Sequence, residues 1–107
     1  MTSDATLGGY FATHERPPAF EGSDGEAYSV AIYVDDTPDP SGRFGASLLF
    51  VRWSADGTAP AGHVETARLV DGASPEEADA AIRRLSLHDV KEQLDLAIVR
   101  RRELPEW

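Results

Sequence analysis

Alternating apolar and polar positions dominate the chain between residues 19 and 53, and this period of two is typical of β-strands. In the segment 28–34 the alternate apolar residues share one face: Tyr28, Val30, Ile32 and Val34. The segment 44–53 is apolar on both faces, with Phe44, Ala46, Leu48 and Phe50 on the first and Leu49, Val51 and Trp53 on the second. A strand of the second kind is usually central in its sheet and covered on both sides.

A hairpin is predicted where Ser23-Asp24-Gly25 separates Phe20 from the strand 28–34. A two-residue loop would place Phe20 opposite Ser29, whereas a three-residue loop with Gly25 left-handed in a bulge places it opposite Tyr28. Only the three-residue loop puts Phe20 on the apolar face, so we predict that loop. The glycines and acids here are therefore interpreted as a turn, because a phosphate-binding loop needs a helix directly after its glycines.

The segments around these strands have weaker patterns. Residues 1–9 are small and polar and predict a flexible lead-in. Residues 10–14 predict a short strand that Pro17-Pro18 ends. Residues 35–42 hold two prolines and a glycine and predict a loop. Residues 63–70 predict a fourth, more polar strand.

The C-terminal third predicts two helices. Ser74 is a typical N-cap, followed by Pro75 in the first turn and Glu77 in the capping-box position, so a helix is expected over 75–85. Its apolar face would next require Asp89 inside, which indicates a break and a second helix over 87–102. The basic run 100–102 lies where a helix C-terminus favours cations, and we prefer that interpretation to a nucleic-acid patch.

These elements predict one α+β domain over residues 1–107. An antiparallel meander sheet of about four strands would be followed by two C-terminal helices packed on one face, as a two-layer sandwich. The expected core comprises one face of the strand 44–53 together with Tyr28, Val30, Ile32, Val34, Ile82, Leu85, Val90, Leu94 and Ile98.

Charge and cysteine content narrow the functional classes. The 107 residues contain no cysteine, which excludes a disulfide scaffold, a thiolate zinc site and a cysteine nucleophile. The formal net charge is −9, and residues 1–40 hold eight acids against the single base Arg16. Nucleic-acid binding needs a basic face and is not expected. We interpret the acidic third mainly as a solubilising surface, and alternatively as a surface for a basic partner or a mimic of nucleic acid.

The expected setting is the cytoplasm of a bacterium. No apolar stretch reaches membrane-spanning length, and the N-terminal residues lack the basic and apolar regions of a secretory signal. Nine arginines against one lysine, with abundant alanine, are typical of a GC-rich bacterial genome. We therefore expect neither a membrane nor a nucleic-acid partner.

Few residues offer chemistry. His63 and Glu65 share a face of the fourth strand and, with Arg68, are the candidate ligand-binding groups of a pocket between sheet and helices. The acids at 35, 36 and 39 lack the spacing of a calcium loop, so a solvated turn is preferred to a metal site. No nucleophile or phosphate-binding motif is present. We predict no catalytic residue, no metal and no cofactor, and expect that the protein is not an enzyme.

The leading hypothesis for function comes from the face that two helices leave uncovered. That face would carry the candidate interface residues Ala31, Tyr33, Leu49, Val51 and Trp53. An uncovered apolar patch usually marks an interface, unless the N-terminal segment or Trp107 folds over it. We therefore expect a protein-binding or oligomerising module, adaptor-like or inhibitor-like, whose partner is a second copy or another protein. The alternative is a small-molecule-binding protein or minor enzyme.

Overall fold

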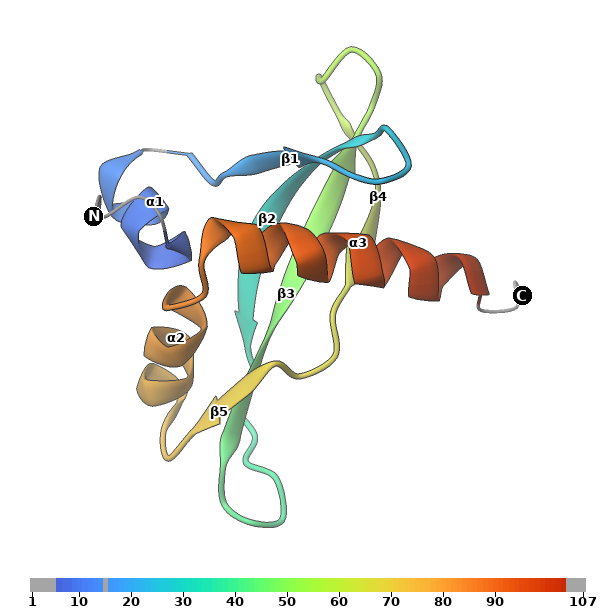
Figure 1. Cartoon of the computed structure of the whole chain (residues 1–107). Helices are drawn as coiled ribbons and strands as arrows, with labels where there is room; N and C mark the ends of the chain where they lie inside the picture. Colours follow the sequence, from blue (N-terminus) through green and yellow to red (C-terminus); the bar gives the residue numbers. More distant parts are fainter. Residues whose placement is uncertain (1–5, 15, 104–107) are drawn as a thin grey trace.

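The computed structural model describes residues 6–14 and 16–103, and within them it has an α+β fold of three helices and five strands (Figure 1). The elements in chain order are α1 (Leu7–Thr13), β1 (Ala19–Glu21), β2 (Ala27–Val34), β3 (Phe44–Trp53), β4 (Pro60–Glu65), β5 (Val70–Gly72), α2 (Pro75–Arg83) and α3 (Leu87–Glu103).

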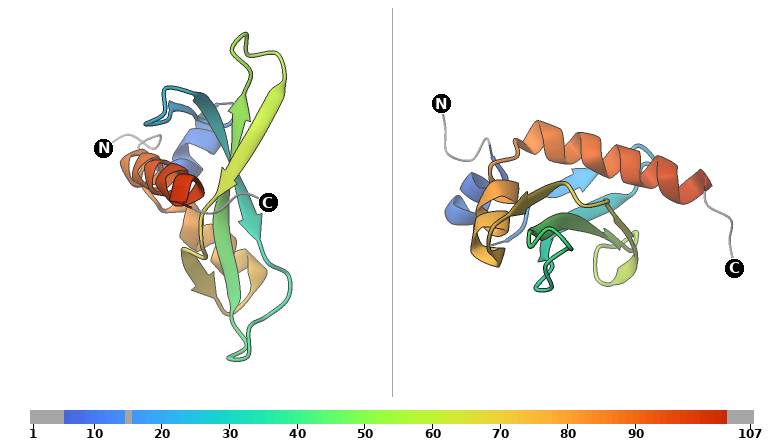
Figure 2. Two further views of the ribbon diagram at one scale, coloured as in Figure 1. Left: turned by 90° about the vertical axis from the view of Figure 1, so that its right-hand side faces the viewer. Right: turned by 90° about the horizontal axis from the view of Figure 1, so that it is seen from below.

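The sheet is antiparallel with the order β1-β2-β3-β4, and β5 also pairs with β3. Ala46 pairs with Val34 of β2 on one side and with Val70 of β5 on the other, so β4 and β5 follow each other along the same side of β3. The prediction of an antiparallel sheet with β3 at its centre is confirmed. Helix α3 crosses one face of the sheet, and α1 and α2 pack beside its N-terminal half (Figures 1 and 2).

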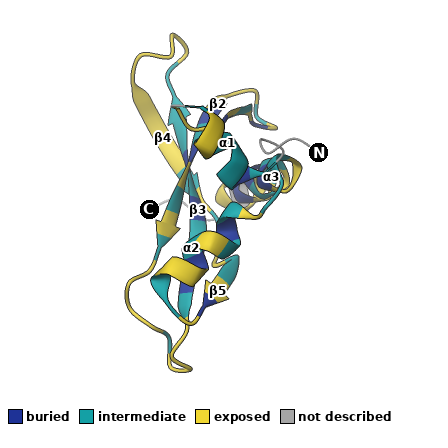
Figure 3. Ribbon diagram, turned by 90° about the vertical axis from the view of Figure 1, so that its left-hand side faces the viewer, coloured by how far each residue is buried: buried dark blue, intermediate teal, exposed yellow. Residues whose placement is uncertain are grey.

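The core lies between that face and the helices (Figure 3). Its residues are at most 5% exposed: Leu7, Tyr28, Val30, Ala46, Leu48, Phe50, Ala78, Ile82, Val90, Leu94, Ala97 and Ile98. The other predicted core residues, Ile32, Val34, Phe44 and Leu85, are partly buried and pack against this cluster. The predicted core is therefore largely confirmed, and Leu7, Ala78 and Ala97 are the members that were not predicted.

The hairpin forms with the predicted register. Phe20 lies opposite Tyr28, and Gly25 has a φ of 81°, the left-handed conformation that favours glycine. Asp24 stabilises the turn, since its carboxylate accepts hydrogen bonds from the Glu26 amide at 3.0 Å and from the Tyr28 hydroxyl at 2.8 Å. The acid in this segment therefore has a structural role.

The two C-terminal helices form close to their predicted bounds. The Ser74 hydroxyl accepts a hydrogen bond from the Glu77 amide at 3.1 Å, and Ser86 caps α3 in the same way through the Asp89 amide at 2.9 Å. Helix α2 ends at Arg83, two residues before the predicted end, and α3 ends at Glu103, one residue after it. Both helix starts follow the capping pattern of the sequence.

The N-terminal prediction is wrong for the residues that the structure describes. Residues 7–13 form α1, where a lead-in and a short strand were expected, and Thr6 caps the helix by accepting from the Gly9 amide at 3.0 Å. Leu7 is fully buried, and its amide donates to the Leu85 carbonyl at 2.8 Å. A Cβ on Gly8 would lie 2.8 Å from the Arg83 Cβ, so glycine permits this close contact between helices. Residues 1–5 of the predicted lead-in lie outside the described residues.

The predicted fourth strand is divided in two. β4 begins at Pro60 and ends at Glu65, and β5 resumes the pairing at Val70. Between them the Leu48 amide donates to the Thr66 hydroxyl at 3.0 Å, so a side chain replaces a backbone carbonyl in the ladder. This substitution interrupts the regular strand while the Thr66 and Leu69 amides still bond to β3.

Candidate functional site

The side of the sheet opposite the helices forms one surface, which we call the open face. Its members alternate with the core residues along the strands: Ser29, Ala31, Tyr33, Ser47, Leu49, Val51, Trp53, His63 and Glu65. The register places Ala31 beside Leu49 and Ser29 beside Val51, and β4 adds Glu65 and His63 to these two rows. All five residues predicted for an interface therefore lie together on this face.

No described helix lies over the open face (Figure 2). The Tyr33 side chain is 57% exposed, while Leu49, Val51 and Trp53 are partly exposed between their neighbours. The Trp53 indole Nε1 donates to the Ser29 hydroxyl at 2.9 Å, which orients the ring across the strands. The surface is thus apolar at its centre and has polar atoms at fixed positions.

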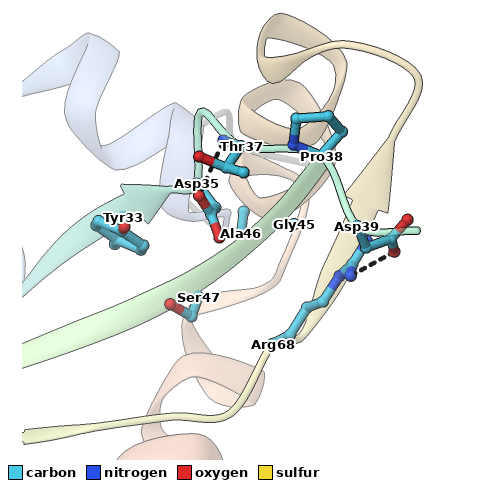
Figure 4. A pocket seen from close by; sticks show the side chains of 9 residues that line it. All are labelled: Tyr33, Asp35, Thr37, Pro38, Asp39, Gly45, Ala46, Ser47 and Arg68. Carbon is cyan, nitrogen blue, oxygen red and sulfur yellow. Dashed lines mark hydrogen bonds and ion pairs between the residues drawn. The ribbon is translucent and has the colours of Figure 1, made fainter. Parts of the chain in front are cut away.

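Two adjoining hollows shape one end of this face. One of about 310 Å³ is lined by Tyr33, Ser47, Leu48, Leu49 and Glu65. The other, of about 240 Å³, lies under the β2–β3 loop and is lined by Tyr33, Asp35, Thr37, Pro38, Asp39, Gly45, Ala46, Ser47 and Arg68 (Figure 4). Because Tyr33 and Ser47 line both, the hollows form a continuous depression along β2 and β3.

Arg68 lies across Gly45 at the far end of this depression. A Cβ at Gly45 would come within 2.5 Å of the Arg68 Nε, so the absent side chain gives Arg68 its place. The guanidinium is 2.7 Å from the Asp39 carboxylate and 3.5 Å from that of Asp71, which also pairs with Arg43 at 2.8 Å. Arg68 is therefore already engaged in an ion-pair network that ties the β2–β3 loop to β5.

The Asp39 carboxylate is the centre of the β2–β3 loop. It accepts hydrogen bonds from the Ser41 hydroxyl at 2.6 Å, the Ser41 amide at 2.9 Å and the Arg43 amide at 3.0 Å. The Ser41 hydroxyl, the Arg43 amide and the Arg68 guanidinium together hold the pKa of Asp39 well below its usual range. The described residues contain no cluster of three or more His, Asp or Glu side chains placed to hold a metal.

The structure does not gather the three predicted ligand-binding residues into one pocket between sheet and helices. The His63 Nε2 lies 3.5 Å from the Glu65 Oε1, and both residues are exposed on the edge strand β4. They border a recess of about 180 Å³ whose other wall is formed by Ala97, Arg100 and Arg101 of α3. Arg68 lines the depression of the open face, because the chain turns away from β4 at Thr66.

The other histidines offer no catalytic arrangement. The His88 Nε2 pairs with Glu92 at 3.0 Å on the exposed side of α3, and the His14 ring packs 4.1 Å from that of Tyr10. Neither pair includes a nucleophile and an orienting acid together. Sequence reasoning also missed Leu96 and Val99 of α3, which are 60% and 46% exposed. Their signal was present, since both lie outside the apolar face of that helix.

No model of a known protein family matches this chain, and neither does any curated protein or solved structure. Among the residues that the structure describes, no helix is both long enough and apolar enough to span a membrane.

Proposed function

We propose that this chain is a protein-binding module and that the open face is its contact surface. One observation carries the proposal: the central strand β3 is apolar on both faces, and only one of them is covered by described helices. Apolar residues on an uncovered sheet face are a common feature of protein interfaces. Tyr33 and Trp53 add the aromatic side chains that often dominate binding energy.

The charge around this face favours a partner with an apolar centre and a basic rim. Glu21 lies on β1 at the sheet edge, Glu65 on β4, and Asp35 and Asp36 follow the end of β2. All four are exposed. With a net charge of −9, the chain attracts a basic protein at long range and steers its approach.

The proposal includes the bacterial cytoplasm as the setting. It is supported by the absence of cysteine, which fits a reducing compartment, and by the excess of arginine over lysine. An adaptor or inhibitor that acts through one exposed sheet face fits a chain of this size.

A site-specific photocrosslinker tests the open face directly. Placed at Val51, it should capture one protein from an extract of the native host, whereas a crosslinker at the exposed Arg84, directly after α2, should not. The variant Tyr33→Glu, combined with the crosslinker at Val51, should lose the captured protein without unfolding. Capture from both positions alike, or from neither, would contradict the proposal.

The depression on the open face supports a second candidate, a small-molecule-binding protein or minor enzyme. Tyr33, Ser47 and Glu65 line it, and its two hollows together approach the size of a ligand pocket. The variant Ser47→Tyr would fill the shared wall of both hollows. A ligand that raises the melting temperature of the wild-type protein, and not that of this variant, would favour a pocket over a protein interface.

A further inference from the structure

The outer edge of β4 is the longer free edge of the sheet. β4 has six residues, all exposed except the partly buried Val64, and no described strand lies beyond it. The opposite edge is divided between β1, which has three residues and follows Pro17-Pro18, and residues 31–34 of β2, which extend beyond the pairing with β1. Unpaired edges invite another strand, and proteins usually cover or shorten them.

Helix α3 extends beyond this edge. Ala97 lines the recesses on both sides of the helix next to β4, which shows where the helix passes the strand. From Val99 to its end at Glu103 the helix advances by about 6 Å, more than the spacing of about 4.8 Å between neighbouring strands. Two views show this end projecting past β4 (Figures 1 and 2). The helix therefore covers the place that one more strand would occupy.

Helix α3 exposes two large apolar side chains near the point where it passes β4. Leu96 and Val99 are, with Tyr33, the large apolar side chains that are well exposed in the described part of the chain. They border a hollow of about 250 Å³ whose opposite wall is formed by Thr66, Ala67 and Leu69. The hollow lies beside the segment that follows β4, and its apolar helical wall is better covered by a packed neighbour than by water.

The charges along α3 are complementary to those of a reversed copy. Asp89, Glu92 and Asp95 precede Leu96, whereas Arg100 and Arg101 follow Val99. The two arginines form no ion pair with any described residue. In an antiparallel pair that places Leu96 against Val99 of the other helix, each Arg100 lies within one helical turn of Glu92 and Asp95 of the second copy.

We propose that two copies of this chain associate across the β4 edge, with β4 pairing antiparallel to β4 of the second copy and the two α3 helices packing antiparallel over the seam. One two-fold axis perpendicular to the sheet produces both contacts and keeps all helices on one side. The open faces of the two copies then join into one broader surface. The inference goes beyond the proposed function, since it assigns self-association to a surface that leaves the open face free.

The net charge of each chain opposes this association only at long range. At about 0.1 M salt, charges more than about 10 Å apart are largely screened, whereas the pairs at the helix seam act in contact. The expected species near physiological salt is therefore a dimer of twice 11.6 kDa.

Light scattering on a sizing column tests whether Leu96 and Val99 of α3 lie in a dimer interface. The double variant Leu96→Glu/Val99→Glu should be monomeric and keep its circular dichroism spectrum, because both side chains are exposed in one copy. Tyr33→Glu, on the open face, should remain dimeric as the matched control. A wild-type monomer at about 100 µM, far above the usual range of specific association, would overturn the inference. So would dissociation by Tyr33→Glu alone, which would place self-association on the open face.

Charge exchange and cross-linking test the antiparallel arrangement. Arg100→Glu should weaken dimerisation roughly tenfold, and Glu92→Arg in the same chain should restore it. Since the chain has no cysteine, a mixture of Leu96→Cys and Val99→Cys chains should form a disulfide-linked heterodimer. Failure of both the restoration and the cross-link, in a chain that dimerises, would overturn the proposed geometry. The outcome of these dimerisation experiments does not depend on the photocrosslinking result at Val51. Either the dimer or the partner-binding role of the open face can therefore be disproved alone.

Discussion

The two faces of β3 share one backbone and have similar side chains but lie in different surroundings. On the covered face, Ala46, Leu48 and Phe50 are at most 1% exposed and pack against the helices. On the open face, Leu49 and Val51 are partly exposed and have no described helix above them. A strand that is apolar on both faces normally lies between two layers. This difference between the two faces is the basis of the proposal that a partner supplies the second layer.

The two faces also differ in how their polar groups are distributed. In the covered layer the Tyr28 hydroxyl bonds to Asp24 at the rim of the core. The open face instead distributes Ser29, Ser47, His63 and Glu65 among its apolar residues. This mixture is typical of surfaces that meet water between binding events, because a wholly apolar face would promote aggregation.

The largest predicted effect comes from placing a charge on each face at neighbouring positions of β2. Val30→Asp should unfold the protein, since an unpaired buried carboxylate costs roughly 4 kcal/mol or more. Ala31→Asp should cost roughly 1 kcal/mol, because its side chain remains in water. Thermal unfolding followed by circular dichroism distinguishes them. Unfolding of the Ala31→Asp protein would show that the open face is covered in the free protein.

Removing the same side chain from the two faces gives a smaller and more quantitative comparison. Leu48→Ala should lower the free energy of unfolding by about 3–5 kcal/mol, since Leu48 is fully buried. Leu49→Ala should lower it by about 1–2 kcal/mol. Chemical denaturation of both variants measures the difference. Equal losses would contradict the contrast between the faces.

The strands and the C-terminal helices were predictable from the sequence because local patterns determine them. The alternation at 28–34 and 44–53 requires one register if the apolar residues are to share a face, and that register also determined the three-residue loop at Ser23-Asp24-Gly25. A local capping pattern also determines where α2 begins, and it consists of Ser74, Pro75 and Glu77.

The N-terminal helix was not predictable because its stability comes from distant contacts. Seven residues with two glycines are too few to form a stable helix alone. Helix α1 persists because Leu7 enters the core, its amide reaches Leu85, and the Phe11 ring lies 5.4 Å from the Arg83 guanidinium. These partners are more than 70 residues away in sequence.

The candidate site was predictable as a face but not in its details. Ala31, Tyr33, Leu49, Val51 and Trp53 share a side once the register is known. By contrast, grouping Arg68 with His63 assumed that one strand continues through Thr66, whose hydroxyl instead interrupts the ladder. The projection of α3 past β4 depends on where helix and sheet cross, which no local pattern encodes.

Removing one side-chain hydrogen bond from each face of the sheet compares the two faces in a third way. Tyr28→Phe should cost about 1 kcal/mol, because it leaves the Asp24 carboxylate without one donor. Ser29→Ala, which removes the acceptor of the Trp53 indole on the open face, should cost about 0.5 kcal/mol or less, because water can replace the hydroxyl. Chemical denaturation at pH 7 compares them, and a larger loss for Ser29→Ala would reverse the expected order.

Measurements at alkaline pH separate out the contribution of the Tyr28 hydroxyl to stability. Burial, followed by the hydrogen bond to Asp24, raises the pKa of Tyr28 from 10.0 to about 12. The contribution of the protonated hydroxyl is therefore complete below pH 10 and is lost as the pH rises towards 12. The stability difference between the wild-type protein and Tyr28→Phe should narrow over that window. A difference that stays constant from pH 9 to pH 12 would contradict this account.

The smallest predicted effect concerns Asp39, at the exposed end of the open face. Asp39→Asn should lower the melting temperature at pH 7, because a neutral amide cannot replace a carboxylate that pairs with Arg68 and accepts from Ser41 and Arg43. The pKa of Asp39 is lowered in the folded state, so its contribution is complete above the ordinary value of 3.8 and is lost as the pH falls below it. Melting curves from pH 7 to pH 2 should show the two proteins converging below about pH 4. Asp36→Asn is the matched control, since that carboxylate makes no hydrogen bond with a described residue, and an equal effect of both variants would show that loop charge alone is responsible.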